Sequence, residues 1–106
     1  MAQYIKAGSQ SIEEIKPKNG KTFTLEEMQK AVGGYIEILH LADGRIMVLN
    51  EEGKLNGLKT NITATGILAE VGSYVFGRHL RHADVIYAFG GNLVGDVLVC
   101  DDTEII

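Results

Sequence analysis

The sequence predicts an α+β domain in which a mainly antiparallel sheet is built around a central hairpin at about residues 35–50, with two or three short helices. Three observations lead to this fold class. Two apolar runs flank Ala42-Asp43-Gly44, and Asp-Gly between apolar runs is typical of a hairpin because glycine adopts positive φ without steric cost. Helix signals precede and follow the hairpin, and strand-like segments lie near both ends of the chain. A chain of 106 residues buries one core, so we expect a single domain over residues 1–106.

Two short strands and a helix are expected before the hairpin. The strands are residues 4–7 and 12–16, with a turn between them. Thr24 and Glu27 match a capping box, in which a hydroxyl and the carboxylate three positions later bond each other's backbone amides. A helix over residues 25–32 therefore follows, with one apolar stripe, and the two glycines after it supply its end.

The hairpin is expected to be apolar on both faces. A two-residue turn at residues 43–44 pairs Leu41 with Ile46 and Leu39 with Val48, and the alternate positions are apolar as well. A sheet with one face in water alternates apolar and polar side chains, so both faces of this one need cover. The helices are expected to cover one face. For the other we favour a second subunit over a further layer, so the sequence predicts a homo-oligomer.

A helix and two strands are expected after the hairpin. Asn61 is a suitable N-cap for a helix over residues 62–70. Residues 84–89 and 95–100 have the apolar, β-branched composition of strands, and glycines separate them. The conformation of residues 72–84 stays open, because its apolar positions suit either a helix or a strand. The expected element order is ββ-α-ββ-α-ββ.

The composition disfavours several classes of protein. The 14 Asp and Glu residues outnumber the 10 Lys and Arg residues, and the net charge of −4 disfavours general binding to nucleic-acid polymers or to anionic membranes. No apolar run reaches the length of a membrane span, and the first residues lack the pattern of a signal peptide. The single cysteine excludes an internal disulfide. We therefore expect a soluble, intracellular protein.

Five stretches of the chain form an ordered series of motifs. They are Thr24-Leu25-Glu26-Glu27-Met28-Gln29, Val32-Gly33-Gly34-Tyr35-Ile36-Glu37, Asn50-Glu51-Glu52-Gly53-Lys54-Leu55-Asn56-Gly57-Leu58, Asn61 with Ala64-Thr65, and Gly95-Asp96-Val97-Leu98-Val99. In this series the chain resembles the DUF3846 family, small proteins of unknown function common in phages, plasmids and other mobile elements. The resemblance covers about residues 24–100 and implies a phage-type accessory protein in the bacterial cytoplasm. It implies no catalytic residues, since none is established for the family.

A basic cluster near residue 80 is the candidate binding site. The candidate site residues are Arg78, His79, Arg81, His82, Tyr74 and Tyr87, and Phe76 is a further aromatic residue close to them in the sequence. Guanidinium groups offer paired donors that suit phosphate, imidazoles add hydrogen bonds, and tyrosine rings are able to stack on a nucleobase. If the segment is helical, the basic side chains share a face at spacings of three and four. These residues therefore indicate a site for a phosphate-bearing ligand. The alternative is a solvated surface cluster that pairs with neighbouring acids such as Asp84.

Other patterns in the chain do not assemble a catalytic or metal site. His79 and His82 are metal ligands by type, but zinc needs three or four ligands and the neighbouring arginines disfavour a dication, so we expect no metal and no cofactor. Residues 90–95 are glycine-rich but lead into a strand, which excludes a P-loop. Consecutive carboxylates at Glu51-Glu52 point in different directions. Cys100, in an apolar strand, is expected to be a buried and unreactive thiol.

The function expected from these observations is binding without catalysis. The first hypothesis is a phage or mobile-element protein that sequesters a small phosphate-bearing ligand, such as a nucleotide immune signal, as a counter-defence. The alternative is an inhibitor or adaptor that acts on a host defence or regulatory protein through the apolar sheet face or the acidic C-terminal tail. A hydrolase of the same ligand is the third hypothesis.

Overall fold

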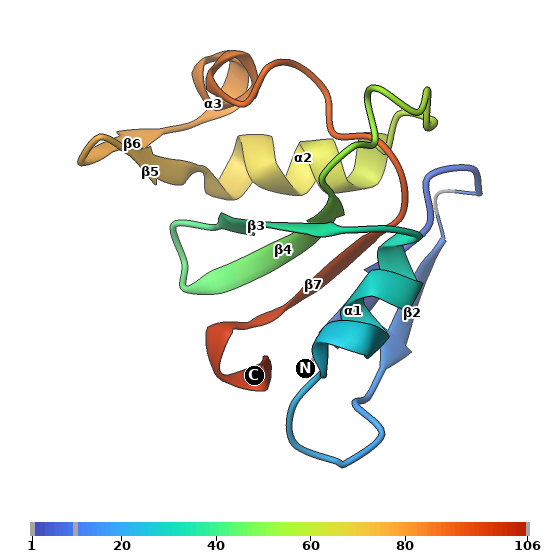
Figure 1. Ribbon diagram of the computed structural model, residues 1–106. Helices are drawn as coiled ribbons and strands as arrows, with labels where there is room; N and C mark the ends of the chain where they lie inside the picture. Colours follow the sequence, from blue (N-terminus) through green and yellow to red (C-terminus); the bar gives the residue numbers. More distant parts are fainter. Residues whose placement is uncertain (1, 10, 106) are drawn as a thin grey trace.

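Five strands form one antiparallel sheet in the order β2-β1-β7-β4-β3 (Figure 1). The computed structural model describes residues 2–9 and 11–105. The strands of the sheet are β1 (Ala2–Ile5), β2 (Ile12–Ile15), β3 (Ile36–His40), β4 (Arg45–Asn50) and β7 (Val97–Asp101). A separate hairpin consists of β5 (Ser73–Val75) and β6 (Arg78–Leu80). The helices are α1 (Leu25–Val32), α2 (Ile62–Val71), α3 (His82–Ala88) and a final 3-10 turn, η1 (Asp102–Glu104). The predicted α+β class, with a mainly antiparallel sheet, a central hairpin and short helices, is confirmed.

The last strand of the chain, β7, lies inside the sheet. It pairs with β1 on one side and with β4 on the other. The side chains of residues 97–100 are all apolar and buried, as expected for a strand whose two faces are both covered. The sheet is therefore complete only when the C-terminal segment has joined the N-terminal strand to the β3–β4 hairpin.

The β3–β4 hairpin is present as predicted, but its register differs by one residue. Leu39 lies opposite Met47 and Ile38 opposite Val48, whereas the two-residue turn predicted Leu39 opposite Val48. The loop contains the three residues 42–44. Because side chains alternate along a strand, this shift exchanges the partners that share a face. Leu39 and Met47 belong to one core cluster and Val48 to the other.

Helices of the same chain cover both faces of the sheet. On the face of α1, the buried residues of the core are Ala2, Phe23, Met28, Val32, Ile46, Val48, Leu98 and Cys100. On the face of α2 and α3, they are Ile5, Leu39, Leu41, Met47, Leu49, Ala64, Leu68, Val85, Leu93, Val97 and Val99. The expected second subunit was argued from an apolar face that the helices would leave uncovered. Helices of the same chain cover both faces among the described residues, so neither face of the sheet requires a second subunit, and the homo-oligomer stays a prediction.

The helix α1 begins and ends as its sequence predicts. The Thr24 hydroxyl accepts a hydrogen bond from the Glu27 amide at 3.1 Å, and the Glu27 carboxylate accepts one from the Thr24 amide at 3.0 Å. Met28 and Val32 are buried against the sheet. Gly33 ends the helix with a φ of 78°, the left-handed conformation that glycine adopts at low cost. The capping box therefore fixes where α1 starts, and its apolar stripe fixes how it packs.

Asn61 joins the start of α2 to the sheet. Its Oδ1 accepts a hydrogen bond from the Ala64 amide at 3.0 Å, which confirms its predicted role as the N-cap. Its Nδ2 donates to the carbonyl oxygens of Ile5, at 3.0 Å, and of Gly95, at 2.9 Å. The side chain is only 1% exposed, so all three bonds form away from water.

Residues 84–89, predicted as a strand, lie mostly in α3, so that prediction is wrong. Val85 is buried, and Ile86 and Phe89 pack against the same core cluster, at the spacing of one helix face. Tyr87 is 87% exposed on the other side. The segment meets the core along one side only, which suits a helix, whereas the predicted strand was inferred from its β-branched composition. No helix in the described part of the chain is long and apolar enough to span a membrane; the longest, α2, has 10 residues.

Candidate functional site

The segment whose conformation the sequence left open is the β5–β6 hairpin and the start of α3 (Figure 1). Val75 lies opposite Arg78, so the turn has two residues, Phe76 and Gly77. Their φ angles are 50° and 77°, and two positive φ angles are what a type I′ turn requires. Asn and Gly suit such positions, whereas positive φ is a strained conformation for a bulky residue. The Phe76 side chain is fully exposed. The tip of the hairpin therefore carries a solvent-exposed aromatic ring on a strained backbone.

Gly72 sets the direction in which the hairpin leaves α2. Its φ is 81° and its ψ −177°, and a Cβ atom at this position would lie 2.3 Å from the carbonyl oxygen of Leu80. Its amide donates to the Leu68 carbonyl at 2.7 Å, and its own carbonyl accepts from the Ala42 amide at 2.8 Å. Only glycine fits between these groups, and the hairpin is held against the end of α2 as a result.

Two of the four predicted basic residues are hydrogen-bonded to the C-terminal end of α2. The Nε2 atom of His79 lies 3.0 Å from the Val71 carbonyl oxygen, and Nε of Arg81 donates to the Glu70 carbonyl at 3.1 Å. The last carbonyls of a helix lack partners within the helix and attract positive charge. His79 and Arg81 therefore have a structural role in addition to any role in binding.

The other predicted site residues are only partly brought together. Arg78 precedes His79 in β6, so the two side chains point to opposite faces of the hairpin. Tyr74 lies opposite His79, and their ring centroids are 5.1 Å apart. His82 begins α3 with a φ of 55°, and Tyr87 follows on the same helix. Apart from the Tyr74–His79 pair, no side-chain hydrogen bond, ion pair or ring contact joins two of the six residues within the described chain.

A polar centre that the sequence analysis did not predict lies beside α1. The Tyr4 hydroxyl is 2.7 Å from the Ala31 carbonyl oxygen and 3.1 Å from Oδ2 of Asp96, so its single proton is shared between two acceptors. The other carboxylate oxygen of Asp96 accepts from the Ala7 amide at 3.0 Å. Burial, with the charge and hydrogen bond of Asp96 adding to it, raises the pKa of Tyr4 to about 12. Tyr4 and Asp96 are 92 positions apart, so no local pattern could have paired them.

The described residues contain neither a reactive cysteine nor a cluster of potential metal ligands. Cys100 is buried, and burial, with Glu104 and Asp101 nearby, raises the pKa of its thiol to about 11. The thiol therefore stays protonated at neutral pH, in agreement with the unreactive cysteine that the sequence predicts. In residues 2–9 and 11–105, no three His, Cys, Asp or Glu side chains come together in a way that could hold a metal ion.

A comparison with models of protein families matches residues 3–105 to DUF3846, a domain of unknown function. The chain belongs to the DUF3846 family. The resemblance in residues 24–100 is thereby confirmed, and it extends over nearly the whole chain. Neither a curated protein nor a solved structure matches this DUF3846 protein. What it does must therefore be inferred from its own geometry.

Proposed function

We propose that this DUF3846 protein is a non-enzymatic binding protein that acts in the bacterial cytoplasm, as an inhibitor or adaptor, by docking on a host protein. The contact surface is the β5–β6 hairpin together with the adjoining α3. The observation that carries the proposal is Phe76, whose ring is fully exposed while its backbone holds a positive φ. Such a residue lowers the stability of the free protein, and a partner that buries the ring would offset that cost.

The side chains near Phe76 are of the types that anchor protein interfaces. Tyr74 and Tyr87 are exposed, and Arg78 follows the turn directly. Aromatic residues and arginine are enriched among the residues that contribute most to binding between proteins. The hairpin also projects beyond the end of the five-stranded sheet (Figure 1). A projecting element suits a groove on another protein, whereas small molecules bind in concave sites.

Of the two surfaces that the sequence suggested for a protein partner, the apolar sheet face is covered within the chain and the acidic tail is exposed. α1 covers one apolar face of the sheet, and α2 with α3 covers the other. The acidic tail is exposed at residues 101–103, and Asp101 begins η1 in a capping box with Glu104. The tail carries no aromatic side chain, so the hairpin end is preferred to the tail, and it replaces the covered sheet face, as the proposed contact surface.

Sequestration of a small phosphate-bearing ligand, such as a nucleotide immune signal, is the second candidate function. The observation that favours it is the exposure of all four basic side chains, Arg78, His79, Arg81 and His82. Two of them already bond the end of α2, so Arg78 and His82 would be the main donors to a phosphate. Docking on a protein is ranked first because it uses the exposed rings and needs no concavity.

The test of docking is a comparison of two variants that each remove an exposed apolar side chain. Phe76→Asn removes the ring at the hairpin tip and places a residue suited to the type I′ turn. Leu55→Asn is the matched control, because Leu55 is 85% exposed in a turn outside the hairpin. Each is immobilised and exposed to bacterial lysate, and bound proteins are quantified by mass spectrometry. A partner should bind wild type and Leu55→Asn and be weakened at least about tenfold by Phe76→Asn.

Binding that Phe76→Asn leaves unchanged, measured again by calorimetry with the purified partner, would contradict docking through the hairpin. The second candidate is tested on the same preparations by releasing small molecules with heat. A phosphorylated molecule that wild type retains and Arg78→Gln loses would support sequestration. Arg78 is chosen over Arg81 because Arg81 also bonds the Glu70 carbonyl.

A further inference from the structure

Two adjoining cavities are lined by residues of α1. The helix α1 lies away from the β5–β6 hairpin (Figure 1). The volumes of the cavities are about 590 and 390 Å³, and both are lined by Tyr4, Lys30 and Ala31. A hollow of this size is within the range of small-molecule sites, which hold a ligand of nucleotide size. None of the six residues near residue 80 lines either cavity, so this surface is separate from the proposed docking surface.

The larger cavity has an apolar and aromatic lining. Phe23 and Leu98 belong to the core on this face of the sheet, and Ile15 and Tyr4 extend the lining toward β1 and β2. Flat or aliphatic parts of a ligand would contact these groups and leave water. The lining therefore suits a molecule with an apolar or aromatic body.

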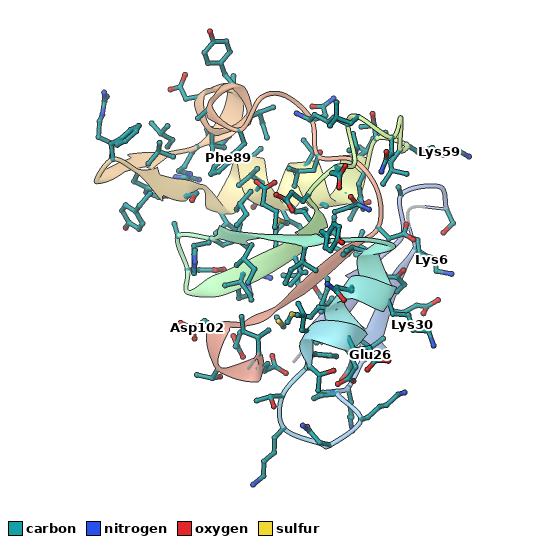
Figure 2. All side chains as sticks on the ribbon, viewed as in Figure 1. Lys6, Glu26, Lys30, Lys59, Phe89 and Asp102 are labelled. Atoms are coloured by element: carbon teal, nitrogen blue, oxygen red, sulfur yellow. The ribbon has the colours of Figure 1, made fainter. Side chains whose placement is uncertain are left out.

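Four lysines line these cavities, and the side-chain amines of three of them have no partner among the described residues. The four are Lys16, Lys18 and Lys30 in the larger cavity and Lys30 and Lys59 in the smaller. The side-chain amines of Lys16, Lys30 and Lys59 make no hydrogen bond or ion pair within the described part of the chain, whereas Lys18 interacts with Glu27. Figure 2 shows Lys30 and Lys59 on the same side of the molecule.

Two of the three acids in the cavities are already bonded by donors of the chain. Glu27 accepts from the amides of Thr24 and Lys18, each at 3.0 Å. Asp96 accepts from the Ala7 amide and from the Tyr4 hydroxyl. Glu26 is the remaining acid and is exposed. These hydrogen bonds come from neutral donors and leave both negative charges in place, so the four lysines face three carboxylates. The linings therefore carry a net formal charge of +1 beside their apolar groups.

The geometry points to a second binding site, in which the cavities along α1 hold a small organic anion: its apolar or aromatic body lies against Phe23 and Ile15 and its anionic group lies near Lys30. Phosphate, sulfonate and carboxylate groups share the required chemistry. The site is independent of the docking surface, so either can be refuted alone.

The test uses anilinonaphthalene sulfonate, a fluorescent probe with an aromatic body and one anionic group. Its uncharged relative N-phenyl-1-naphthylamine has the same body without the sulfonate. Wild type should bind the sulfonate probe with higher affinity than the uncharged probe. Lys30→Gln should weaken binding about threefold to fivefold, as expected for one partly exposed charge, and Glu26→Gln should strengthen it. Lys21→Gln is the control, because Lys21 is an exposed lysine that lines neither cavity.

Displacement of the probe by other anions identifies the class of anion, and changes in the NMR spectrum locate the binding site. Displacement of the probe by adenosine monophosphate but not by adenosine would assign a phosphate ligand, and displacement by octanoate a carboxylate; both support an anion site. Amide shifts in the NMR spectrum should concentrate on Tyr4 and Ala31, and Phe76→Asn should leave the affinity unchanged. Equal affinity in wild type and Lys30→Gln, or shifts confined to other parts of the chain, would overturn the proposal. Far-UV circular dichroism checks that each variant is folded.

Discussion

The sheet with α1 and α2 differs from the β5–β6 hairpin with α3 in two properties, the hydrogen bonding of its polar groups and the strain of its backbone. In the sheet region the oxygen and the nitrogen of the side-chain amides of Asn50 and Asn61 all have hydrogen-bond partners. The hairpin region contains Phe76 and His82, the two residues other than glycine that have positive φ in the described chain. Its helix α3 also begins without a hydrogen bond from a capping side chain. Stability is thus concentrated in the sheet, and strain and exposure are concentrated in the hairpin, as expected of a scaffold that presents a contact surface.

The largest expected effect is on the sheet region, through Asn61→Ala. The substitution removes the N-cap of α2 and leaves the buried carbonyls of Ile5 and Gly95 without their shared donor. We expect the free energy of unfolding to fall by about 3–5 kcal/mol. Urea unfolding followed by circular dichroism measures it. Asn92→Ala, at an exposed position, should change it by less than about 0.5 kcal/mol. A small effect of Asn61→Ala would mean that the hydrogen bonds of the Asn61 side chain contribute little to the stability of the sheet region.

Gly72→Ala, at the place where the two regions meet, is expected to lower the free energy of unfolding by a smaller amount. The added Cβ atom would lie 2.3 Å from the Leu80 carbonyl, on a backbone with positive φ. We expect a loss of about 2–4 kcal/mol, with the hairpin displaced from the end of α2. Gly66→Ala, within α2, is the matched control: nothing lies within 4 Å of its added Cβ atom, and it should stabilise by about 0.5–1 kcal/mol. If both variants have equal stability, the junction at Gly72 is not tightly packed.

The elements that local chemistry determines were predictable from the sequence. Thr24 and Glu27 lie three positions apart, and their reciprocal bonds alone place the start of α1. Asn61 caps α2 in the same local way. The order of the strands was not predictable, because the place of β7 between β1 and β4 depends on contacts between distant parts of the chain.

The register of the β3–β4 hairpin and the helix α3 could not be predicted from the pattern of apolar residues. Both faces of β3 and β4 are apolar, so the pattern could not choose between loops of two and three residues. In the three-residue loop that forms, the Asp43 carboxylate accepts hydrogen bonds from the amide and from Nε of Arg45, two positions later. In α3, β-branched residues suggested a strand, but only one side of the segment meets the core. Burial on one side or on both is a tertiary property that composition does not show.

The candidate site was predictable in position but not in arrangement. The sequence located the basic and aromatic residues in one segment, and the structure gathers that segment in the hairpin and the start of α3. The bonds of His79 and Arg81 to the end of α2 depend on the turn at Gly72, which places β6 beside the helix end. The cavities along α1 combine residues from 4 to 98, so no spacing within the sequence pointed to them.

The smallest expected change in the free energy of unfolding comes from a substitution at Tyr4. The pH dependence of that change tests whether the hydrogen bonds of Tyr4 stabilise the sheet region. Tyr4→Phe removes the hydrogen bonds to Ala31 and Asp96, so we expect a loss of about 1 kcal/mol at pH 7. Tyr35→Phe, at an exposed ring, is the control and should have almost no effect.

The difference between wild type and Tyr4→Phe should shrink at alkaline pH. The pKa of Tyr4 is about 12 in the folded protein against 10.0 for an ordinary tyrosine, because the ring is partly buried and its hydroxyl faces Asp96. The unfolded chain therefore loses the Tyr4 proton first, and the stability that this proton provides is present below pH 10 and is lost as the pH rises toward 12. Urea unfolding at pH 7, 9, 10 and 11 measures the difference. A difference that stays constant up to pH 11 would show that Tyr4 ionises alike in both states, and that its surroundings in the folded protein do not raise its pKa.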